Sequence, residues 1–315
     1  MLEPELIGRV DSLEENRPLV LSSAWPRRWW LNLLLFLLTF ITTTIFGAAM
    51  ERSFSLGQPL DVDRLWESYV GFAHGDRQLW QGLLFSAPLL LILSAHEFGH
   101  YLECRKWRVD ASLPYFLPSP TLFGTLGAFI RIRSPIYSRK GLFDIGIAGP
   151  LAGFAVLLPF LIAGVVLSHP MAQPVQGPFV FGTPLVLRIF EWVRFGDLDS
   201  PRILLHPVAM AGWAGLLATA MNLLPMGQLD GGHILYAVFG ERGHRLVSFG
   251  VVVLLALLGF LYWPWWFWAL VTFFLFRRHP LVYDRTPLTR DRLVLCVVAL
   301  LVFLLSASIV PIRAS

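Results

Sequence analysis

The sequence predicts an all-α, polytopic membrane protein with six to seven transmembrane helices. Hydrophobic residues make up 56% of the 315 residues and charged residues only 15%, whereas roughly 25% of the residues in an average soluble domain are charged. Most of the long apolar runs could cross a hydrocarbon core of about 30 Å. Composition also excludes other classes. Two cysteines cannot build a disulfide scaffold, and a net charge of only +4 predicts no nucleic-acid partner.

The candidate spans follow one another along most of the chain. They are the apolar runs 29–50, 79–102, 145–167, 203–224, 246–262, 265–276 and 293–310. The sixth run is short and is typical of a tilted or partial span, so the expected number is six or seven. The Trp-rich stretch 263–268 is typical of an aromatic belt at a membrane surface.

The basic residues predict how these spans are oriented. With the N-terminus inside, 18 of the 25 Lys and Arg residues fall in inner segments, and an excess of Lys and Arg marks cytoplasmic loops. The start of the chain has no short apolar run with a cleavage site, and its acidic character is unusual for a transit peptide. We therefore expect a multi-pass protein of the bacterial cytoplasmic membrane with a cytoplasmic N-terminus.

The second run contains a candidate metal-binding motif, His96-Glu97-Phe98-Gly99-His100. Residues four apart share one face of an α-helix, so both imidazoles can reach one ion, and Glu97 is offset by about 100° beside it. His96 lies about 24 Å of helix beyond Trp80, several ångströms inside the membrane. Ionisable groups at that depth are functional candidates by default. The alternative is a hydrated helix end.

A catalytic zinc usually has three protein ligands and one water, so a third ligand must come from elsewhere. Asp230 is the best placed, because it follows the fourth run, which ends on the same side as the second. An N-cap of the following helix explains Asp230 equally well. The candidates beyond the motif are Glu103, Glu191, His206, Asp230, His233 and Glu241.

Together these segments resemble the site-2 protease family of intramembrane zinc metalloproteases. That family pairs H-E-x-x-H on one transmembrane helix with N-x-x-P-x(4)-D-G on a later one, and this chain has Asn222-x-x-Pro225-x(4)-Asp230-Gly231. The family's Gly-Pro-rich segment is similar to residues 149–153. The resemblance covers about 80–240. The chain lacks room for the PDZ domain of many bacterial members, and it looks closer to compact members without one, including the chloroplast-type branch.

The resemblance implies an activity and a set of roles. His96, His100 and Asp230 would hold one Zn²⁺ per chain, and Glu97 would be the catalytic base. The implied reaction is hydrolysis of a peptide bond in or near a transmembrane segment of another membrane protein, so the implied partners are that substrate and the lipid bilayer. The alternative is a non-proteolytic, metal-binding transporter, since intramembrane His and Asp also mark ion pathways.

The domain organisation follows from the spans and the motifs. We expect a cytoplasmic N-terminal tail at 1–28, an integral membrane metalloprotease domain at 29–310 and a C-terminal tail at 311–315. The catalytic core of that domain would be about 79–240.

Between the two motifs, apolar residues alternate along 124–133, which predicts a strand. We expect a short β-like, re-entrant segment near the active site. Its residues Gly127, Ala128 and Ile130 are candidates for substrate contact, because an extended substrate could add to a strand edge. The alternative is an interfacial hairpin whose arginines face lipid phosphates.

Two further features concern the surroundings of the motifs. The resemblance suggests that Asn222 lies near the substrate carbonyl, although a helix–helix hydrogen bond is equally possible. Gly146, Gly149 and Gly153 lie three and four residues apart. We expect them to let the third span approach the motif-bearing helix closely.

Overall fold

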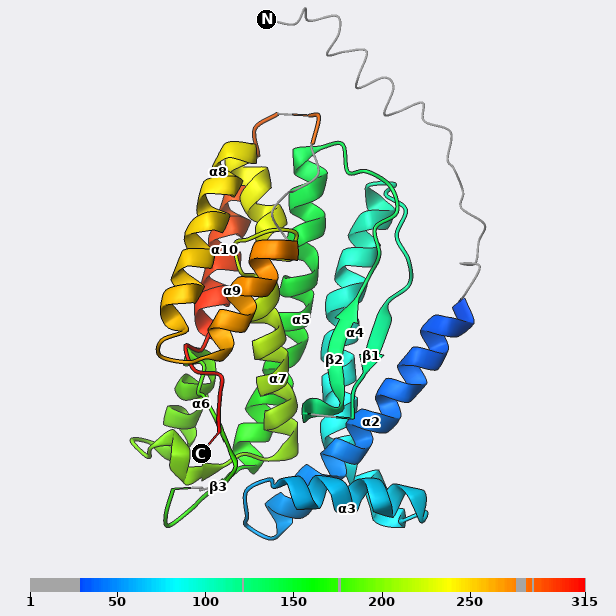
Figure 1. The fold of residues 1–315 in the computed structure, drawn as a ribbon, viewed down its shortest axis with the longest axis vertical. Helices are drawn as coiled ribbons and strands as arrows, with labels where there is room; N and C mark the ends of the chain where they lie inside the picture. Colours follow the sequence, from blue (N-terminus) through cyan, green and yellow to red (C-terminus); the bar gives the residue numbers. More distant parts are fainter. Residues whose placement is uncertain (1–28, 121, 175–176, 276–281, 285, 315) are drawn as a thin grey trace, which may run out of the picture.

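The computed structural model describes residues 29–120, 122–174, 177–275, 282–284 and 286–314. This part of the chain is mostly helical, as expected. The expected N-terminal tail, 1–28, lies outside the described residues. The helices of the bundle are α2 (Trp29–Ser55), α4 (Leu83–Lys106), α5 (Arg139–Leu167), α7 (Pro207–Asn222), α8 (Asp230–Leu258), α9 (Pro264–Leu275) and α10 (Arg290–Ser306). Helices such as α4, α5, α7 and α8 run close to the vertical axis of Figure 1.

Short elements connect these helices. The two short α-helices are α3 (Val62–Ala73) and α6 (Leu185–Phe195), and both lie at the lower end in Figure 1. Three 3₁₀ turns complete the helical elements: η1 (Arg77–Gly82), η2 (Leu122–Gly124) and η3 (Ser200–Arg202). Two pairs of very short antiparallel strands join distant loops: β3 (His169–Pro170) with β5 (Ile203–Leu204), and β4 (Phe179–Phe181) with β6 (Ile312–Ala314).

Three helical segments of the described chain are long and apolar enough to cross a membrane: Trp29–Ser55, Arg77–Lys106 and Arg139–Leu167. They correspond to the first three expected spans. The later runs are also helical, but α7 has only 16 residues and α10 only 17. α8 is interrupted at Gly240, whose φ of 71° lies in the left-handed region that favours glycine. The expectation of six to seven spans therefore stays a prediction.

α5 lies at the centre of the bundle, where it contacts α4, α7 and α8. The largest cluster of buried side chains joins α2, α4, α5 and α7, and it includes Phe46, Phe85, Leu161 and Trp213. A second cluster joins α5, α8 and α10. Lipid tails are as apolar as these side chains, so in a bilayer close packing and hydrogen bonds must hold the helices together instead of the hydrophobic effect.

Glycines allow the closest helix approaches. A Cβ built on Gly82, at the end of η1, would overlap the carbonyl oxygen of Thr44 in α2, and one on Gly47 would overlap the carbonyl oxygen of Gly82. A Cβ on Gly164 of α5 would likewise overlap the backbone of Ala209 in α7. These backbones touch because the side chains are absent, which is the usual way in which transmembrane helices associate.

A β-hairpin lies between α2 and α4 (Figure 1). Its strands β1 (Tyr115–Pro118) and β2 (Thr125–Phe129) pair antiparallel, with Phe116 opposite Ala128. The pairing is irregular beyond Phe116, where Gly127 has a φ of 103°. The strand expected within 124–133 is therefore present, although it is shorter than that segment. Whether the hairpin enters the bilayer stays a prediction.

Polar side chains of α2 hold this hairpin. Asn32 Nδ2 donates to the carbonyl oxygens of Leu113 and Pro114 at 3.0 and 2.9 Å. Thr42 Oγ1 donates to the carbonyl oxygen of Gly124 at 2.6 Å. Asn32 is 7% exposed, so these bonds satisfy polar groups that would otherwise be buried unpaired.

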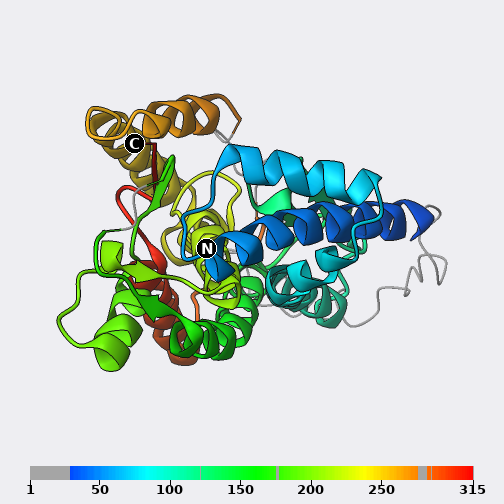
Figure 2. The ribbon, with the colours of Figure 1, turned by 90° about the horizontal axis from the view of Figure 1, so that it is seen from below.

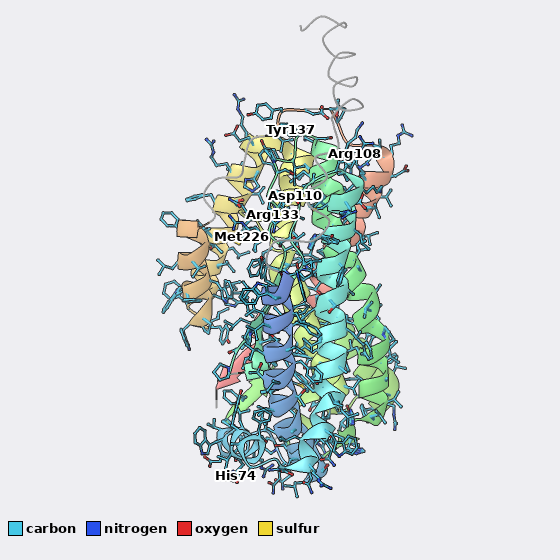
Figure 3. The ribbon with its side chains drawn as sticks, turned by 90° about the vertical axis from the view of Figure 1, so that its right-hand side faces the viewer. His74, Arg108, Asp110, Arg133, Tyr137 and Met226 are labelled. Atoms are coloured by element: carbon cyan, nitrogen blue, oxygen red, sulfur yellow. The ribbon has the colours of Figure 1, made fainter. Side chains whose placement is uncertain are left out.

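The two ends of the bundle carry different loops. Figure 3 places Arg108, Asp110, Arg133 and Tyr137 near the upper end, in the loop between α4 and α5, and His74 at the lower end. The upper loop is closed by a backbone hydrogen bond from Arg133 to Asp110 at 2.8 Å. Seen from below, α2 and α3 lie side by side at one edge of the molecule (Figure 2).

The contact between Gly82 and α2 gives a first prediction. Gly82→Ala adds a methyl group where the backbone of Thr44 lies, and overpacking of this kind typically costs about 1–3 kcal/mol of stability. We expect a lower thermal unfolding midpoint for the purified protein in detergent. The matched control is Gly250→Ala in α8, where a Cβ would meet nothing within 4 Å. An unchanged midpoint for Gly82→Ala would show that this contact is not tight.

Candidate metal centre

α4 carries the H-E-x-x-H motif on a fully helical stretch, so His96 and His100 share one face. Their rings are 4.9 Å apart, and the two side chains lie in the interior of the bundle. His96, Glu97 and His100 are 5%, 5% and 6% exposed. The hydrated-helix-end alternative is therefore wrong, because all three ionisable side chains are buried.

Asp230 is the first residue of α8. α7 ends at Asn222, and a short turn through Pro225 and Gly227 separates the two helices; Gly227 has a φ of 58°. The residue in the N-cap position is Leu229, and no side chain caps the helix. The alternative role of Asp230 as an N-cap therefore does not apply.

The Asp230 carboxylate faces both histidines. Its Oδ2 atom lies 3.2 Å from Nε2 of His96 and 3.2 Å from Nε2 of His100. The two Nε2 atoms are 3.1 Å apart. These three atoms form a nearly equilateral triangle. Among the described residues, His96, His100 and Asp230 form the group of at least three His, Cys, Asp or Glu side chains whose possible ligand atoms lie close enough together to hold one metal ion.

The triangle has the dimensions of a tetrahedral zinc site. Nitrogen and oxygen ligands about 2.0–2.1 Å from zinc lie about 3.3 Å from one another in tetrahedral geometry. The protonation of His100 supports the same conclusion. Its Nδ1 lies 2.7 Å from the carbonyl oxygen of Ile145 and donates to it, so Nε2 of the neutral ring carries a lone pair. The other two ligand atoms lie 3.1 and 3.2 Å from this nitrogen, an arrangement that a bound cation would stabilise.

Glu97 lies beside this triangle but is not part of it. Its carboxyl group accepts a backbone hydrogen bond from Ile130, directly after β2. The hairpin therefore lies against Glu97 and contacts its carboxyl group. This contact joins segments 33 residues apart, and no local pattern in the sequence indicates it.

α5 closes the site from the other side. A Cβ on Gly149 would overlap the imidazole of His100, and one on Gly153 would lie 3.1 Å from Cβ of His96. The expected close approach of this helix to the motif is confirmed. Gly146 serves a different contact, with His233 of α8.

Asn222 at the end of α7 also reaches the site. Its Nδ2 lies 3.2 Å from Nε2 of His96. The hydrogen bond to another helix that the sequence left open is therefore present. This hydrogen bond uses Nε2 of His96, the atom that also faces Asp230.

The turn before Asp230 is held by two residues that sequence reasoning missed. His244 Nε2 donates to the carbonyl oxygen of Gly227 at 2.9 Å, and the N–H of Gly227 donates to Ser248 Oγ at 3.4 Å. His244 and Ser248 are four residues apart in α8 and therefore share a face. No local pattern singles them out, because Glu241, Arg242 and Arg245 make this stretch of α8 polar in any case.

The other third-ligand candidates make contacts elsewhere. Glu103 pairs with Lys106, and Glu241 pairs with Arg245. Glu191 accepts a hydrogen bond from Ser200, and burial raises the pKa of its carboxyl group. His206 is the N-cap of α7, and His233 lies against Gly146.

Residues 84–262, which contain all of these ligand candidates, match the sequence profile of Peptidase family M50. The chain belongs to this family. The resemblance to the site-2 proteases is thereby confirmed. Family membership also favours a protease over the transporter alternative.

Three relatives show how far the similarity extends. The chain is 34% identical over 267 residues to the probable zinc metalloprotease EGY1, chloroplastic, of Oryza sativa subsp. japonica, covering 79% of this chain and 46% of the relative. It is 34% identical over 244 residues to the protein of the same name from Arabidopsis thaliana, covering 73% and 43%. It is 31% identical over 202 residues to the probable zinc metalloprotease EGY2, chloroplastic, of Arabidopsis thaliana, covering 63% and 36%. The chain therefore spans less than half the length of these relatives.

These relatives correct the expected location. The expected location in the bacterial cytoplasmic membrane is wrong, because these relatives are chloroplastic proteins of plants. The bias of Lys and Arg among loops indicates orientation across a membrane. It does not identify which membrane, and the composition of the N-terminal segment was too weak a signal to decide.

The contact between α5 and His100 gives a second prediction. Gly149→Ala places a methyl group where the imidazole lies, so the ring must move away from His96 and Asp230. Changes to the groups that orient a metal ligand typically cost about 10–100-fold in metal affinity, and we expect a loss of that size for zinc. The measurement is competition with a chelator.

A matched control separates this effect from general damage to α5. Ala155→Val enlarges an exposed residue of the same helix, and zinc affinity should stay at the wild-type level. Unchanged affinity in Gly149→Ala would contradict the close packing of α5 against the site.

Proposed function

We propose that this protein is an intramembrane zinc metalloprotease that hydrolyses peptide bonds in or near transmembrane segments of membrane proteins. The observation that carries the proposal is the triangle of ligand atoms from His96, His100 and Asp230, buried among apolar helices with Glu97 beside it. Family membership and the names of the relatives support the same activity.

His96, His100 and Asp230 are the proposed ligands of one Zn²⁺ per chain. When bound, zinc supplies Lewis-acid polarisation of the scissile carbonyl group and makes water acidic enough to act as a nucleophile at neutral pH. The donor set of two imidazoles and one carboxylate suits this ion. The backbone carbonyl of Ile145 holds His100 in the tautomer that binds a metal through Nε2.

Glu97 is the proposed catalytic base. It takes the proton from the attacking water and delivers it to the leaving amine. The hydrogen bond from Ile130 keeps the carboxylate in place. Glu97 is 5% exposed, so its carboxyl group has little contact with bulk water.

Asn222 is the proposed contact to the substrate carbonyl oxygen. Nε2 of His96 has one lone pair. If His96 used that lone pair to hold a metal ion, the Asn222 amide would lose its present partner. The freed N–H groups can then donate to a new acceptor at the site. An amide that donates to the developing oxyanion stabilises the transition state.

The proposed substrate pairs with β2 in an extended conformation. A peptide bond within a helix is shielded by its own hydrogen bonds and side chains, so the substrate helix must unwind before cleavage. β2 and the residue after it lie next to Glu97, and Gly127 faces open space on its Cβ side. Gly127, Ala128 and Ile130 are the residues that we expect to contact the substrate strand.

The proposed arrangement in the membrane has an N-terminal tail at 1–28, an integral metalloprotease domain at 29–310 with a core at about 79–240, and a C-terminal tail at 311–315. Six to seven helices would cross the lipid bilayer. The basic loop at the upper end would face the side of the N-terminus. Support comes from the three long apolar helices and from the loop charges.

The role of Glu97 gives a third prediction. Glu97→Gln retains the shape of the side chain, but an amide cannot accept the proton. We expect proteolysis of a membrane substrate to fall at least about 100-fold, because general acid–base catalysis typically contributes 10²–10⁴. Bound zinc, measured on the same sample, should stay at one per chain.

Glu103→Gln is the control, since Glu103 pairs with Lys106 away from the site. It should cleave at the wild-type rate. Wild-type turnover by Glu97→Gln would rule out the base, and loss of zinc from that variant would make Glu97 a ligand instead.

The role of β2 gives a fourth prediction. Ala128→Pro removes one backbone N–H from the strand, and we expect cleavage to fall while zinc content and membrane insertion stay intact. Ile130→Pro should also reduce cleavage, but it additionally removes the hydrogen bond to Glu97. Ala128→Pro therefore tests the strand edge more directly.

Ala128→Val and Ile130→Val are the controls, because both keep the backbone N–H. They should cleave like the wild type. Normal cleavage by both proline variants would disprove the proposed pairing of substrate with β2 and would leave the zinc site unaffected.

A further inference from the structure

α3 lies across the lower end of the bundle, whereas α4 runs along the long axis and α2 descends obliquely to the same end (Figure 1). α3 begins after Asp61, whose side chain accepts the N–H of Asp63 as an N-cap. Val62, Trp66 and Val70 are four residues apart, so they form one stripe along the helix. Their exposed fractions are 58%, 69% and 39%. The outer face of α3 is therefore apolar.

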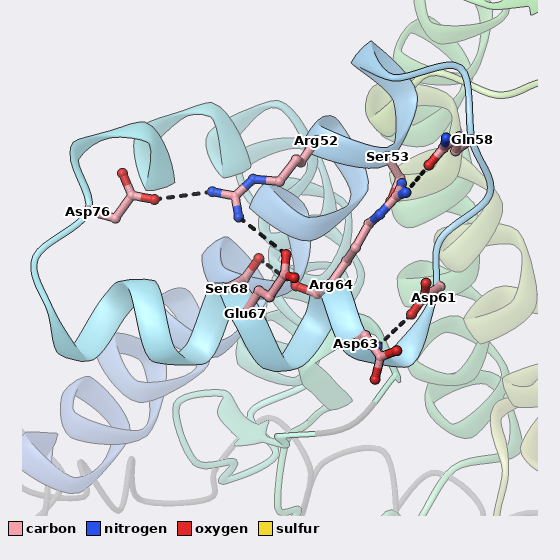
Figure 4. Close-up of polar contacts among 9 residues, drawn as sticks. All are labelled: Arg52, Ser53, Gln58, Asp61, Asp63, Arg64, Glu67, Ser68 and Asp76. Atoms are coloured by element: carbon pink, nitrogen blue, oxygen red, sulfur yellow. Dashed lines mark hydrogen bonds and ion pairs between the residues drawn. The ribbon is translucent and has the colours of Figure 1, made fainter.

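The inner face of α3 is fixed to the bundle. Ser68 is fully buried, and Leu65 packs against the largest buried cluster. Arg64 donates to Oγ of Ser53 at 3.3 Å and also to the side-chain oxygen of Gln58 (Figure 4). The helix thus cannot turn its apolar stripe inward.

A pair of ionic contacts ties α3 to both neighbouring spans. Arg52, near the end of α2, donates to Asp76 at 3.1 Å and lies 4.0 Å from Glu67 of α3 (Figure 4). Asp76 in turn is the N-cap of η1, which leads directly into α4. One guanidinium group therefore connects α2, α3 and the start of the motif-bearing span.

The position of α3 indicates what covers the stripe. The candidate span Trp29–Ser55 ends seven residues before α3, and the next, Arg77–Lys106, begins four residues after it. A helix that joins the ends of two spans in so few residues must lie at the boundary of the bilayer. Tryptophan prefers this boundary, because its ring is apolar and its N–H is polar.

The charges around the stripe indicate how α3 binds. Asp63 and Glu67 follow Val62 and Trp66 directly, so they lie at one edge of the stripe, where they can stay in water. Residues 61–77 contain four acids and two arginines. This segment is not polybasic, so attraction to anionic lipid does not explain its placement. Insertion of its apolar side chains among the lipid acyl chains explains its placement instead.

We propose that α3 is an interfacial helix whose stripe Val62, Trp66 and Val70 is inserted at the headgroup–acyl boundary of the lipid leaflet in which α2 ends. The occupant of this surface is the bilayer itself. Through Arg52, the depth of α3 sets the depth of α2 and of the start of α4. This inference does not depend on the proposed protease activity.

Spin labels provide the test and our fifth prediction. Single cysteines replace Val62, Asp63, Trp66, Glu67 or Val70 in the full chain, with Cys104 and Cys296 changed to serine. Each labelled protein is reconstituted in phosphatidylcholine vesicles, and its accessibility to oxygen and to a water-soluble nickel chelate is measured. At positions 62, 66 and 70 collisions with oxygen should exceed those with the chelate. At positions 63 and 67 the order should reverse.

Two controls keep the result interpretable. Each variant must unfold at the temperature of the cysteine-free parent, which excludes misfolded samples. The pattern should be the same in 0.1 and 1 M salt, because hydrophobic insertion is not screened whereas attraction between exposed charges is.

Three outcomes would overturn the proposal. Equal access of the chelate to all five positions would place α3 in water. Exclusion of both reagents from the stripe, with spin–spin broadening that decreases on dilution with unlabelled protein, would show that a second copy covers it. Loss of the pattern at 1 M salt would show electrostatic attachment.

Discussion

The convergence of two imidazoles and a carboxylate inside an apolar bundle is the constraint on which the rest of the structure depends. Three ligand atoms from α4 and α8 lie within 3.1–3.2 Å of one another. Unpaired, such groups are costly to bury in a low-dielectric interior. The helices near the site must therefore hold these side chains in one arrangement. They do so by packing closely against the ligands and by hydrogen-bonding to them.

Hydrogen bonds from other parts of the bundle hold the ligands, Glu97 and the turn before Asp230 in place. Ile145 of α5 orients His100, and Ile130 after the hairpin orients Glu97. His244 and Ser248 bind the C=O and the N–H of Gly227, three residues before Asp230. Most of these contacts involve a backbone group of the supporting residue. The side chain of such a residue can therefore vary without a change in the geometry of the contact.

The sequence indicated the helices and the motif residues because both are local patterns. The spacing of His96 and His100 places them on one helical face whatever the tertiary structure. Asp230 was identified from the side on which its run ends and from the paired motif of the family, but its distance from the histidines depends on how α7 and α8 pack, which no local pattern determines. The hydrogen bond from Ile130 to Glu97 was hidden for the same reason. The number of spans was uncertain because α7 and α10 are short and Gly240 interrupts α8.

The hairpin that orients Glu97 depends in turn on α2. Asn32 donates to carbonyl oxygens directly before β1, and Thr42 donates to one in the turn before β2. In a lipid environment such bonds replace the hydrophobic effect as the source of helix association. The far end of α2 is joined through Arg52 to α3 and to the start of α4. α2 therefore connects the surface helix at one end of the bundle with the strand beside the metal centre. If α2 moves along its axis while the bonds from Asn32 and Thr42 stay intact, the hairpin must move with it. The backbone group that contacts the Glu97 carboxylate then moves as well.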